Sequence, residues 1–463
     1  MIVTTIRSGE IGGRQMHSVE ARRRAYLPTI QAFLSRDFTL FILALLLFRL
    51  LLLVMLGSFV EEREFTDDVD MLQEIARHPF KLLIGHSRYA QPPPLLGFAE
   101  AAFFAPVDVF ANEFENYRIT LILYELLGAA LLWFALSLYP EPVTGTTRLL
   151  LASAYLLLPS QWMSSVVMAQ DEIIAFVFIL AVLACIAARR YSAALLVAGF
   201  GVAAGKIFII LLLFPLLALA PSPKLWKRLL IGATPVALAY LVQFGGAFTW
   251  VDHVPLASFH PAAPFSISFW TWLTPLLGLS VPHTLRISGT LGLTASVVLT
   301  LVAIYLWEDV NLKNASSSQR LTENIAALFY AVLAWFFAFF YHVNPEYLAL
   351  LSACLLLMRP GLAFLLAHAT LCTLAWLVNF AYGIDKSLTS TKALHGKAKF
   401  VRLYQEYSPL DPHTVYELAL AVSVALLIGL AVWSTVLTLA RIRVHERYAV
   451  AAPEWTGARS TAD

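Results

Sequence analysis

The sequence is poor in charge and in cysteine. Charged residues make up 13% of the 463 residues, against about 25% in a soluble domain. The formal net charge is only +2, and no basic stripe is present, which argues against nucleic acid as a partner. The three cysteines all lie inside apolar runs, so we interpret them as small core residues and not as disulfide partners or metal ligands.

Several motifs of soluble enzymes and pumps are also missing. The chain has no P-loop, GxGxxG, HExxH or GxSxG pattern. The sequence therefore carries none of these motifs of ATP-driven transporters and hydrolases. Hydrophobic residues, by contrast, make up 59% of the chain, and several apolar runs reach the roughly 20 residues that cross a bilayer. We predict an all-α polytopic membrane protein.

We expect about twelve transmembrane helices. The candidate spans are 38–59, 92–110, 117–138, 148–166, 171–188, 192–205, 207–220, 229–249, 285–306, 323–341, 346–358, 361–382 and 415–440. The three runs between residues 91 and 171 must make an even number of crossings if both ends of that stretch lie on one face. One of the three is therefore expected to be re-entrant, or two to form a bent pair.

Charged residues between the runs predict the orientation. Six arginines in 1–37 place the basic N-terminal segment in the cytoplasm. The transmembrane domain is then 38–440, and 441–463 is a short cytoplasmic tail. Three loops fall on the extracytoplasmic face: 61–91, 250–283 and 383–413.

An acidic cluster follows the first apolar run. Asp67, Asp68 and Asp70 do nothing for burial. Carboxylates this close can share a divalent cation, Asp68 and Asp70 being the ligands if there is one, or one of them can act as a general base. The alternative is a solvated loop whose acids cap the helix that follows.

Further polar residues are expected on the same face. Arg88 and Tyr89 precede three prolines and an apolar run, which suits either a phosphate or sugar contact or an ordinary interfacial anchor. Gln170 and Asp171 begin another span, where an acid also complements the helix dipole. Two acidic sites on one rim favour a cation or a sugar hydroxyl as ligand.

Lys206 lies between two short apolar runs, next to Gly205. An ammonium at membrane depth must be paired or face water. A lipid phosphate is one natural partner, and an intramembrane acid such as Glu100 or Glu125 is the alternative. Arg49, in the first span, either snorkels or pairs.

A last polar group sits between two spans. His342 and Glu346 belong to the segment Tyr341-His342-Val343-Asn344-Pro345-Glu346-Tyr347. A helix cap explains part of this pattern, and substrate binding is the other reading.

The order of these segments resembles that of a known family. Thr66-Asp67-Asp68-Val69-Asp70, Tyr89 through Leu96, Ser164-Ser165 with Ala169-Gln170-Asp171-Glu172, Gly199 through Phe208, and His342 through Tyr347 resemble motifs of the C superfamily of integral-membrane glycosyltransferases. Within it, the chain is most similar to the catalytic subunit of GPI mannosyltransferase I and its prokaryotic relatives. The resemblance covers most of residues 38–360.

The resemblance implies a GT-C bundle and an inverting hexosyl transfer, mannose favoured, from a polyprenyl-phosphate sugar. The acceptor would be a hydroxyl of a lipid, glycan or protein on the extracytoplasmic face. Asp68 would be the base, and Asp70 and Asp171 would position the acceptor or a cation. Lys206 and Arg88 would hold the donor phosphate. A divalent cation, Mg or Mn, is not obligatory, because the leaving group is already a phosphate.

Two other functions remain open from the residues alone. A lipid or sugar transporter or flippase would show an inverted repeat with paired broken helices. A non-catalytic membrane subunit would tolerate loss of Asp68. The membrane would be the plasma membrane in a prokaryote and the endoplasmic reticulum in a eukaryote.

Overall fold

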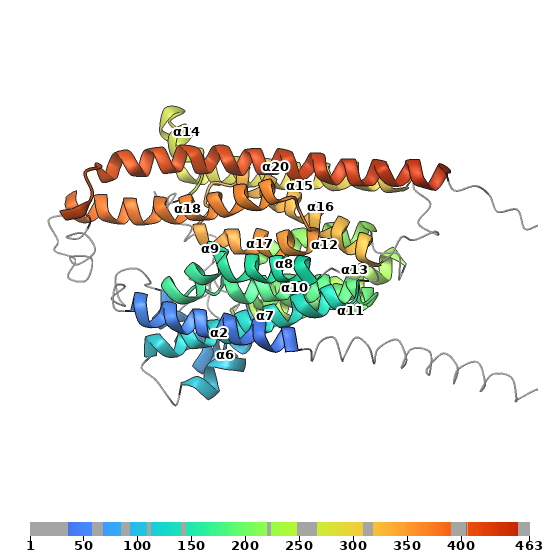
Figure 1. Ribbon diagram of the computed structural model, residues 1–463, viewed down its shortest axis with the longest axis horizontal. Helices are drawn as coiled ribbons and strands as arrows, with labels where there is room; N and C mark the ends of the chain where they lie inside the picture. The colour runs from blue at the N-terminus through green and yellow to red at the C-terminus, as the bar shows by residue number, and fades with distance from the viewer. Residues whose placement is uncertain are drawn as a thin grey trace, which may run out of the picture.

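The computed structural model is a bundle of roughly parallel helices, elongated along the helix axes (Figure 1). It describes residues 36–57, 68–84, 93–108, 113–139, 145–219, 224–247, 266–308, 318–389, 404 and 406–451. Within these ranges the chain is helical and contains no strand. The all-α prediction is confirmed.

The first half of the bundle contains short as well as long helices. They are α2 (Arg36–Gly57), α4 (Asp68–Arg77), α5 (Pro79–Leu83), α6 (Leu96–Val107), α7 (Glu113–Ser137), α8 (Gly145–Leu157), α9 (Pro159–Trp162), the π-helix η1 (Met163–Val167) and α10 (Glu172–Ala187).

The second half of the bundle also contains both short and long helices. They are α11 (Tyr191–Ala204), the 3-10 turn η2 (Ile207–Ile209), α12 (Ile210–Leu219), α13 (Leu225–Ala247), α14 (Trp270–Leu276), α15 (Val281–Glu308), α16 (Ser318–Phe339), the 3-10 turn η5 (Pro345–Tyr347), α17 (Leu348–Met358), α18 (Leu362–Thr389) and α20 (Pro412–Ala451).

The protein is an integral multi-pass membrane protein. Seven of the described helices are long and apolar enough to cross a bilayer, and five shorter apolar helices accompany them. Large apolar side chains such as Leu47, Val54 and Leu241 are exposed on the outside of the bundle, as expected where the solvent is lipid. The predicted number of about twelve spans stays a prediction.

The centre of the bundle is apolar on all sides. Helices α10, α16 and α17 pack against one another, and almost every residue of α10 and α17 is buried. A helix without a polar face is stable only where protein or lipid surrounds it completely. These helices therefore form the core, and α2 and α20 lie on opposite sides of it (Figure 1).

Helix α6 occupies the first of the three apolar runs between residues 91 and 171. This helix has 12 residues, so it is about 18 Å long and too short for a hydrocarbon core of ~30 Å. It packs against α4 and α7. Which of the three runs is re-entrant or bent stays a prediction.

Several boundaries differ from the prediction. Helix α18 continues to Thr389, seven residues past the predicted end of its span, and α20 begins at Pro412. The predicted loop 383–413 is correspondingly shorter. The predicted tail 441–463 is also partly helix, because α20 continues to Ala451. A helix that has formed continues into polar sequence when nothing breaks it, which hydropathy alone does not reveal.

The bundle has two distinct ends. At one, Arg441 donates to the carbonyl of Met358 at 2.8 Å, and Arg359 forms an ion pair with Glu323 at 3.2 Å; we call this the Arg441 end. Helix α2 begins at this end and α20 finishes at it, on the right of Figure 1. The opposite end, where α10 begins and α11 stops, is called the Lys206 end.

Candidate functional site

The site begins at a break between two helices. Helix α11 ends at Ala204, and Lys206 has extended backbone (φ −124°, ψ 143°) before η2 starts. A Cβ on Gly205 would lie 2.9 Å from the carbonyl oxygen of Gly201 and 3.2 Å from the Cα of Ala175 in α10. Only glycine therefore lets the chain turn this close to α10.

The break places Lys206 between two acids. Its ammonium lies 2.9 Å from Asp171 Oδ1 and 2.9 Å from Glu172 Oε1. Both acids are buried, and the Lys206 side chain is 23% exposed. The intramembrane partner that the sequence left open is thus neither Glu100 nor Glu125. It is the pair of acids at the start of α10.

An unusual turn presents this pair. The π-helix η1 ends at Val167, and Ala169 follows with φ +52°, a left-handed conformation that a non-glycine residue rarely adopts. The amide of Gln170 donates to the carbonyl of Ser164 at 2.8 Å, and its side chain donates to the carbonyl of Met168 at 3.2 Å. Gln170 therefore stabilises the turn. π-Helices are rare and are frequent at functional sites.

Besides Asp171 and Glu172, a further buried acid comes from α6. Glu100 is fully buried, and its Oε1 accepts a hydrogen bond from the hydroxyl of Tyr117 in α7 at 2.8 Å. Asp171 and Lys206 interact electrostatically with this carboxyl group. Helix α6 is held here by its first turn, because the amide of Leu95 donates to the carbonyl of Ala203 at 2.7 Å. Two acidic regions distant in the sequence therefore meet beside Lys206.

A fourth acid comes from the turn after α16. Glu346 is buried in η5 and interacts electrostatically with Glu172. The next residue, Tyr347, places its ring centroid 6.0 Å from the ammonium of Lys206, within the range of a cation–π contact. His342 lies on the same turn, and burial lowers the pKa of His342 to about 4. It is therefore neutral at physiological pH.

The 266–268 segment fixes this turn in place. The amide of Ile267 donates to the carbonyl of Val343 at 2.8 Å. The amide of Val343 in turn donates to the hydroxyl of Ser266 at 2.6 Å. Trp270 adds a hydrogen bond to the carbonyl of Phe339 at 2.7 Å. The turn that carries His342 and Glu346 is thus held by hydrogen bonds from residues 266–270 to Val343 and to Phe339, which precedes the turn.

Four buried acids belong to this site. Asp171 and Glu172 form ion pairs with Lys206, and Glu100 and Glu346 interact electrostatically with this group. Two oxygens, Glu172 Oε2 and Glu100 Oε2, are buried without a hydrogen-bond partner. Buried polar atoms of this kind are costly, so the group is suited to accept hydrogen bonds from hydroxyls or to take up a proton.

Helix α4 packs beside the site, against the helix that carries Glu100. This helix begins at Asp68 and packs against α6. Arg77, its last residue, forms a two-pronged ion pair with Asp108 at 2.8 and 3.1 Å, which holds the pKa of Asp108 below its ordinary value. A Cβ on Gly97 would lie 2.7 Å from the carbonyl of Ile75, so the two helices touch.

The predicted site residues divide into three groups. Lys206, Asp171 and Glu346 meet at the Lys206 end, with Gln170 in the turn and His342 beside it. Asp68 and Asp70 lie in the first turn of α4, with their side chains outside the described residues. The remaining three lie wholly outside the described residues: Asp67, Arg88 and Tyr89.

Sequence reasoning missed several partners. Glu172, Tyr117 and Tyr347 were not selected, and Glu100 was considered only as an alternative partner for Lys206. A buried acid next to Asp171 was the available signal for Glu172. The glycine of the Gly199-to-Phe208 motif has a packing role, because a Cβ on Gly199 would lie 2.3 Å from the carbonyl of Gly232 in α13.

The described part of the chain contains no group of three or more His, Cys, Asp or Glu side chains that could hold a metal ion. The predicted metal ligands, Asp68 and Asp70, lie beyond that test because their side chains are not described. The prediction of a divalent cation stays a prediction.

Comparison with known proteins adds little to this geometry. No known family and no curated protein matches the chain. Among solved structures, the chain is similar to the crystal structure of ArnT from Cupriavidus metallidurans bound to undecaprenyl phosphate. The match has 14% identity and a TM-score of 0.46, and it covers 89% of this chain and 78% of that one. A match at this level assigns neither a family nor a substrate, and we base no argument on it.

Proposed function

We propose that this protein is an integral membrane glycosyltransferase with a GT-C architecture. It transfers a hexose, mannose favoured, from a polyprenyl-phosphate donor to an acceptor hydroxyl on the extracytoplasmic face. The acceptor is a lipid, a glycan or a protein.

The observation that carries the proposal is the convergence at the Lys206 end. Five segments whose order resembles the glycosyltransferase motifs lie far apart in sequence. Three of them meet there through Asp171, Lys206 and Glu346, and the helix that begins at Asp68 packs on α6, which contributes Glu100 to the same site. A structural role alone would not require buried acids from three segments, α6, the start of α10 and η5, in one group with a lysine.

The ion pairs of Lys206 suggest how the site works. An incoming donor phosphate competes with Asp171 and Glu172 for the ammonium, and 23% of the lysine side chain is exposed to receive it. The exchange leaves both carboxylates free to accept hydrogen bonds from sugar or acceptor hydroxyls. Lys206, joined by Arg88, then neutralises the charge that grows on the leaving phosphate.

The transfer itself is a single displacement. The acceptor oxygen attacks the anomeric carbon, its proton passes to a carboxylate of the first loop, and the bond from the anomeric carbon to the phosphate oxygen breaks. We assign the base role to Asp68, with Asp70 and Asp67 as its neighbours. His342, neutral at physiological pH, and Tyr89 are assigned to sugar contacts. A Mg or Mn ion at Asp68 and Asp70 would assist the phosphate but is not obligatory.

The experiment is transfer of radiolabelled sugar from polyprenyl-phosphate-mannose and polyprenyl-phosphate-glucose into a membrane lipid extract. Purified wild type and Asp68→Ala are compared, with and without a chelator. Transfer by the wild type that collapses in the variant supports the proposal, and the productive donor identifies the sugar. Loss of activity with the chelator identifies a metal requirement. Equal activity of the variant would remove Asp68 from the mechanism.

One observation favours a transporter or flippase as the second candidate. The break between α11 and η2, with Lys206 at its centre, is the kind of interrupted helix that carries substrate sites in secondary transporters. Reconstituted vesicles separate the two functions. A transporter would move a polyprenyl-phosphate lipid between leaflets without consuming the sugar donor.

A further inference from the structure

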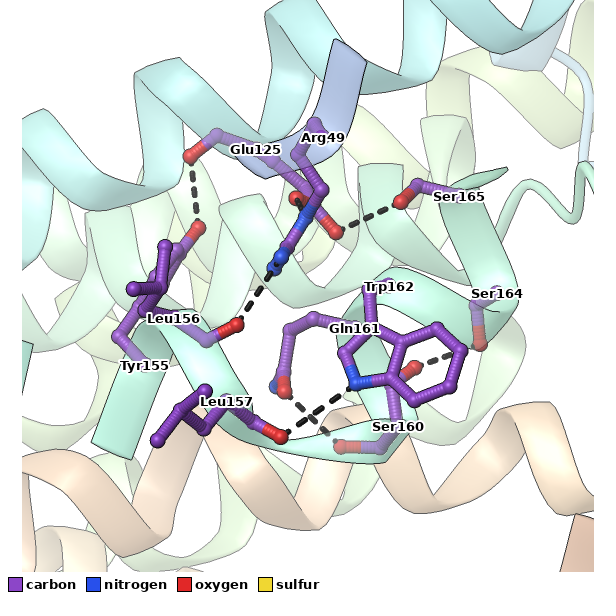
Figure 2. Close-up of polar contacts among 10 residues, drawn as sticks. All are labelled: Arg49, Glu125, Tyr155, Leu156, Leu157, Ser160, Gln161, Trp162, Ser164 and Ser165. Carbon is purple, nitrogen blue, oxygen red and sulfur yellow. Dashed lines mark hydrogen bonds and ion pairs between the residues drawn. The ribbon is translucent and has the colours of Figure 1, made fainter. Parts of the chain in front are cut away.

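A second charged group lies in the membrane region, away from Lys206. Arg49 of α2 and Glu125 of α7 form a fully buried ion pair, with both side chains 0% exposed (Figure 2). Both positions lie within helices that are long and apolar enough to span a bilayer. Charges at such positions are rare and usually functional.

Hydrogen bonds extend this pair to two further segments. The Nη1 of Arg49 donates to the carbonyl of Leu156, near the end of α8, at 2.9 Å. The hydroxyl of Ser165, in the π-helix η1, donates to Glu125 Oε1 at 2.7 Å. Tyr155 donates to the backbone carbonyl of Glu125 at 2.6 Å. Figure 2 shows the guanidinium of Arg49 and the hydroxyl of Ser165 approaching Glu125 from different helices.

Stability does not account for this arrangement. Removing two charges from water is costly, and a buried ion pair can often be replaced by apolar side chains without loss of stability. The pair is also incompletely satisfied, because the Nη2 of Arg49 is buried without a partner. A network that is expensive and imperfect suggests a requirement for one defined geometry.

One segment of the network continues directly into the turn that presents Asp171. Helix α2, which carries Arg49, ends at Gly57 and is the last described helix before α4 and Asp68. The π-helix η1, which carries Ser165, runs directly into the left-handed Ala169 and then Asp171. Glu125 lies between them on α7, two turns beyond Tyr117, the partner of Glu100.

We propose that Arg49 and Glu125 are positioning residues that hold the first membrane helix in register with η1. The turn that presents Asp171 is thereby kept in a fixed position relative to α2 and α7. This inference rests on the proposed function for its catalytic readout, but not for its structural one.

The central test replaces both charges with apolar side chains of similar length, in Arg49→Met/Glu125→Met. The double variant leaves no uncompensated charge, so we expect it to purify as wild type does and to melt within a few degrees of it. We expect kcat for sugar transfer to fall at least tenfold, with KM for the donor changed less than about threefold, because misplacement of reacting groups by ~1 Å costs up to ~100-fold. A folded double variant with wild-type kcat would overturn the proposal.

Ser165→Ala provides a milder variant should the double variant fail to fold. It removes the hydrogen bond between η1 and Glu125 and leaves the ion pair intact. We expect kcat to fall about threefold to tenfold and the melting temperature to fall by a few degrees, because the buried carboxylate of Glu125 loses a donor. A variant that keeps both full activity and wild-type amide exchange would contradict the positioning role.

Hydrogen exchange supplies the readout that does not need activity. In the double variant and in Ser165→Ala, we expect peptides covering 163–172 to exchange faster, including the amide of Gln170 that is bonded to Ser164. Peptides from α7 should exchange as in wild type. If the wild type transfers no sugar, the proposed function fails while this measurement still decides the inference. Unchanged exchange in both variants would refute it.

The matched control is the ion pair at the other end of the bundle. Arg359→Met/Glu323→Met removes the same two charges from a site on α16 and the turn after α17, away from η1 and the Asp171 turn. We expect unchanged kcat and unchanged exchange at 163–172. An equal loss in this control would indicate a general effect of removing charge and would overturn the proposal.

Discussion

The two ends of the bundle differ in the charged side chains that they carry. At the Arg441 end, cations lie where helices end: Arg441 donates to the last carbonyl of α17, and Arg359 follows that helix with φ +49°. At the Lys206 end, acids gather around one lysine, and two carboxylate oxygens are buried without a partner.

Helix termination explains the charged residues at the Arg441 end but not all of those at the Lys206 end. Basic side chains near carbonyls and a left-handed residue after the last turn are ordinary ways to end a helix. An acid at the start of α10 is equally ordinary, but the addition of Glu100 and Glu346 from other segments is not. This clustering of buried acid is the reason why we propose the Lys206 end as the functional one.

The largest expected effect comes from removing Lys206. Lys206→Met leaves Asp171 and Glu172 buried side by side without their cation, at a cost of about 3–5 kcal/mol. We expect a large fall in melting temperature and loss of sugar transfer. Arg359→Met, at the Arg441 end, breaks a partly exposed pair and should cost at most about 1 kcal/mol. Similar costs for the two variants, measured by thermal unfolding in detergent, would remove the contrast.

A smaller effect is expected from Gly205→Ala. Its new Cβ would lie 2.9 Å from the carbonyl of Gly201 and 3.2 Å from Ala175, so α10 or the break must shift, at about 1–3 kcal/mol. Sugar transfer should fall with it, because Lys206 moves. Gly289→Ala is the control: its Cβ meets nothing within 4 Å, and alanine in α15 should stabilise by up to about 1 kcal/mol. Equal stability of the two variants would show that the break tolerates a side chain.

Two buried tyrosines sharpen the comparison further. The Tyr117 hydroxyl donates to Glu100, and Tyr117→Phe should cost about 1–3 kcal/mol because it leaves that carboxylate without its donor. The Tyr139 hydroxyl, near the Arg441 end, is buried without a partner, so Tyr139→Phe should be neutral or slightly stabilising. Chemical denaturation of both variants checks this. A neutral Tyr117→Phe would mean that Glu100 is already protonated or solvated.

The smallest effect is expected from the backbone strain at Ala169. Ala169→Gly should stabilise by up to about 1 kcal/mol, because glycine adopts φ +52° without the steric cost of a Cβ. Arg189→Gly, with φ +57° on an exposed turn, should gain a similar amount. A melting temperature that rises in the second variant and falls in the first would indicate that the Cβ of Ala169 itself contributes packing at the site.

The spans were predictable because the bilayer imposes a strong and local rule. Every backbone group must be satisfied within a helix, and the side chains must be apolar over its length. The predicted spans at 171–188 and 192–205 therefore lie within a residue or two of α10 and α11. For the stretch from 91 to 171, the sequence indicated only that the number of crossings must be even. It did not indicate that the first run would form a helix as short as α6.

The site was predictable as a set of residues but not as a set of contacts. Asp171, Lys206 and Glu346 stand out in the sequence because polar groups are rare in apolar surroundings. That Lys206 pairs with both acids of α10, and that Arg49 and not Lys206 takes Glu125, depends on how helices rotate against one another. No local pattern encodes that rotation.

The sequence by itself therefore determined that the chain spans a membrane, where most helices begin and end, and which side chains needed a polar partner. Hydropathy and the cost of burying charge act residue by residue, so they can be read locally. Only the tertiary structure decided which acid meets which cation, since Lys206 and Arg49 lie 34 to 76 residues from the acids with which they pair. Their geometry follows from the packing of the whole bundle.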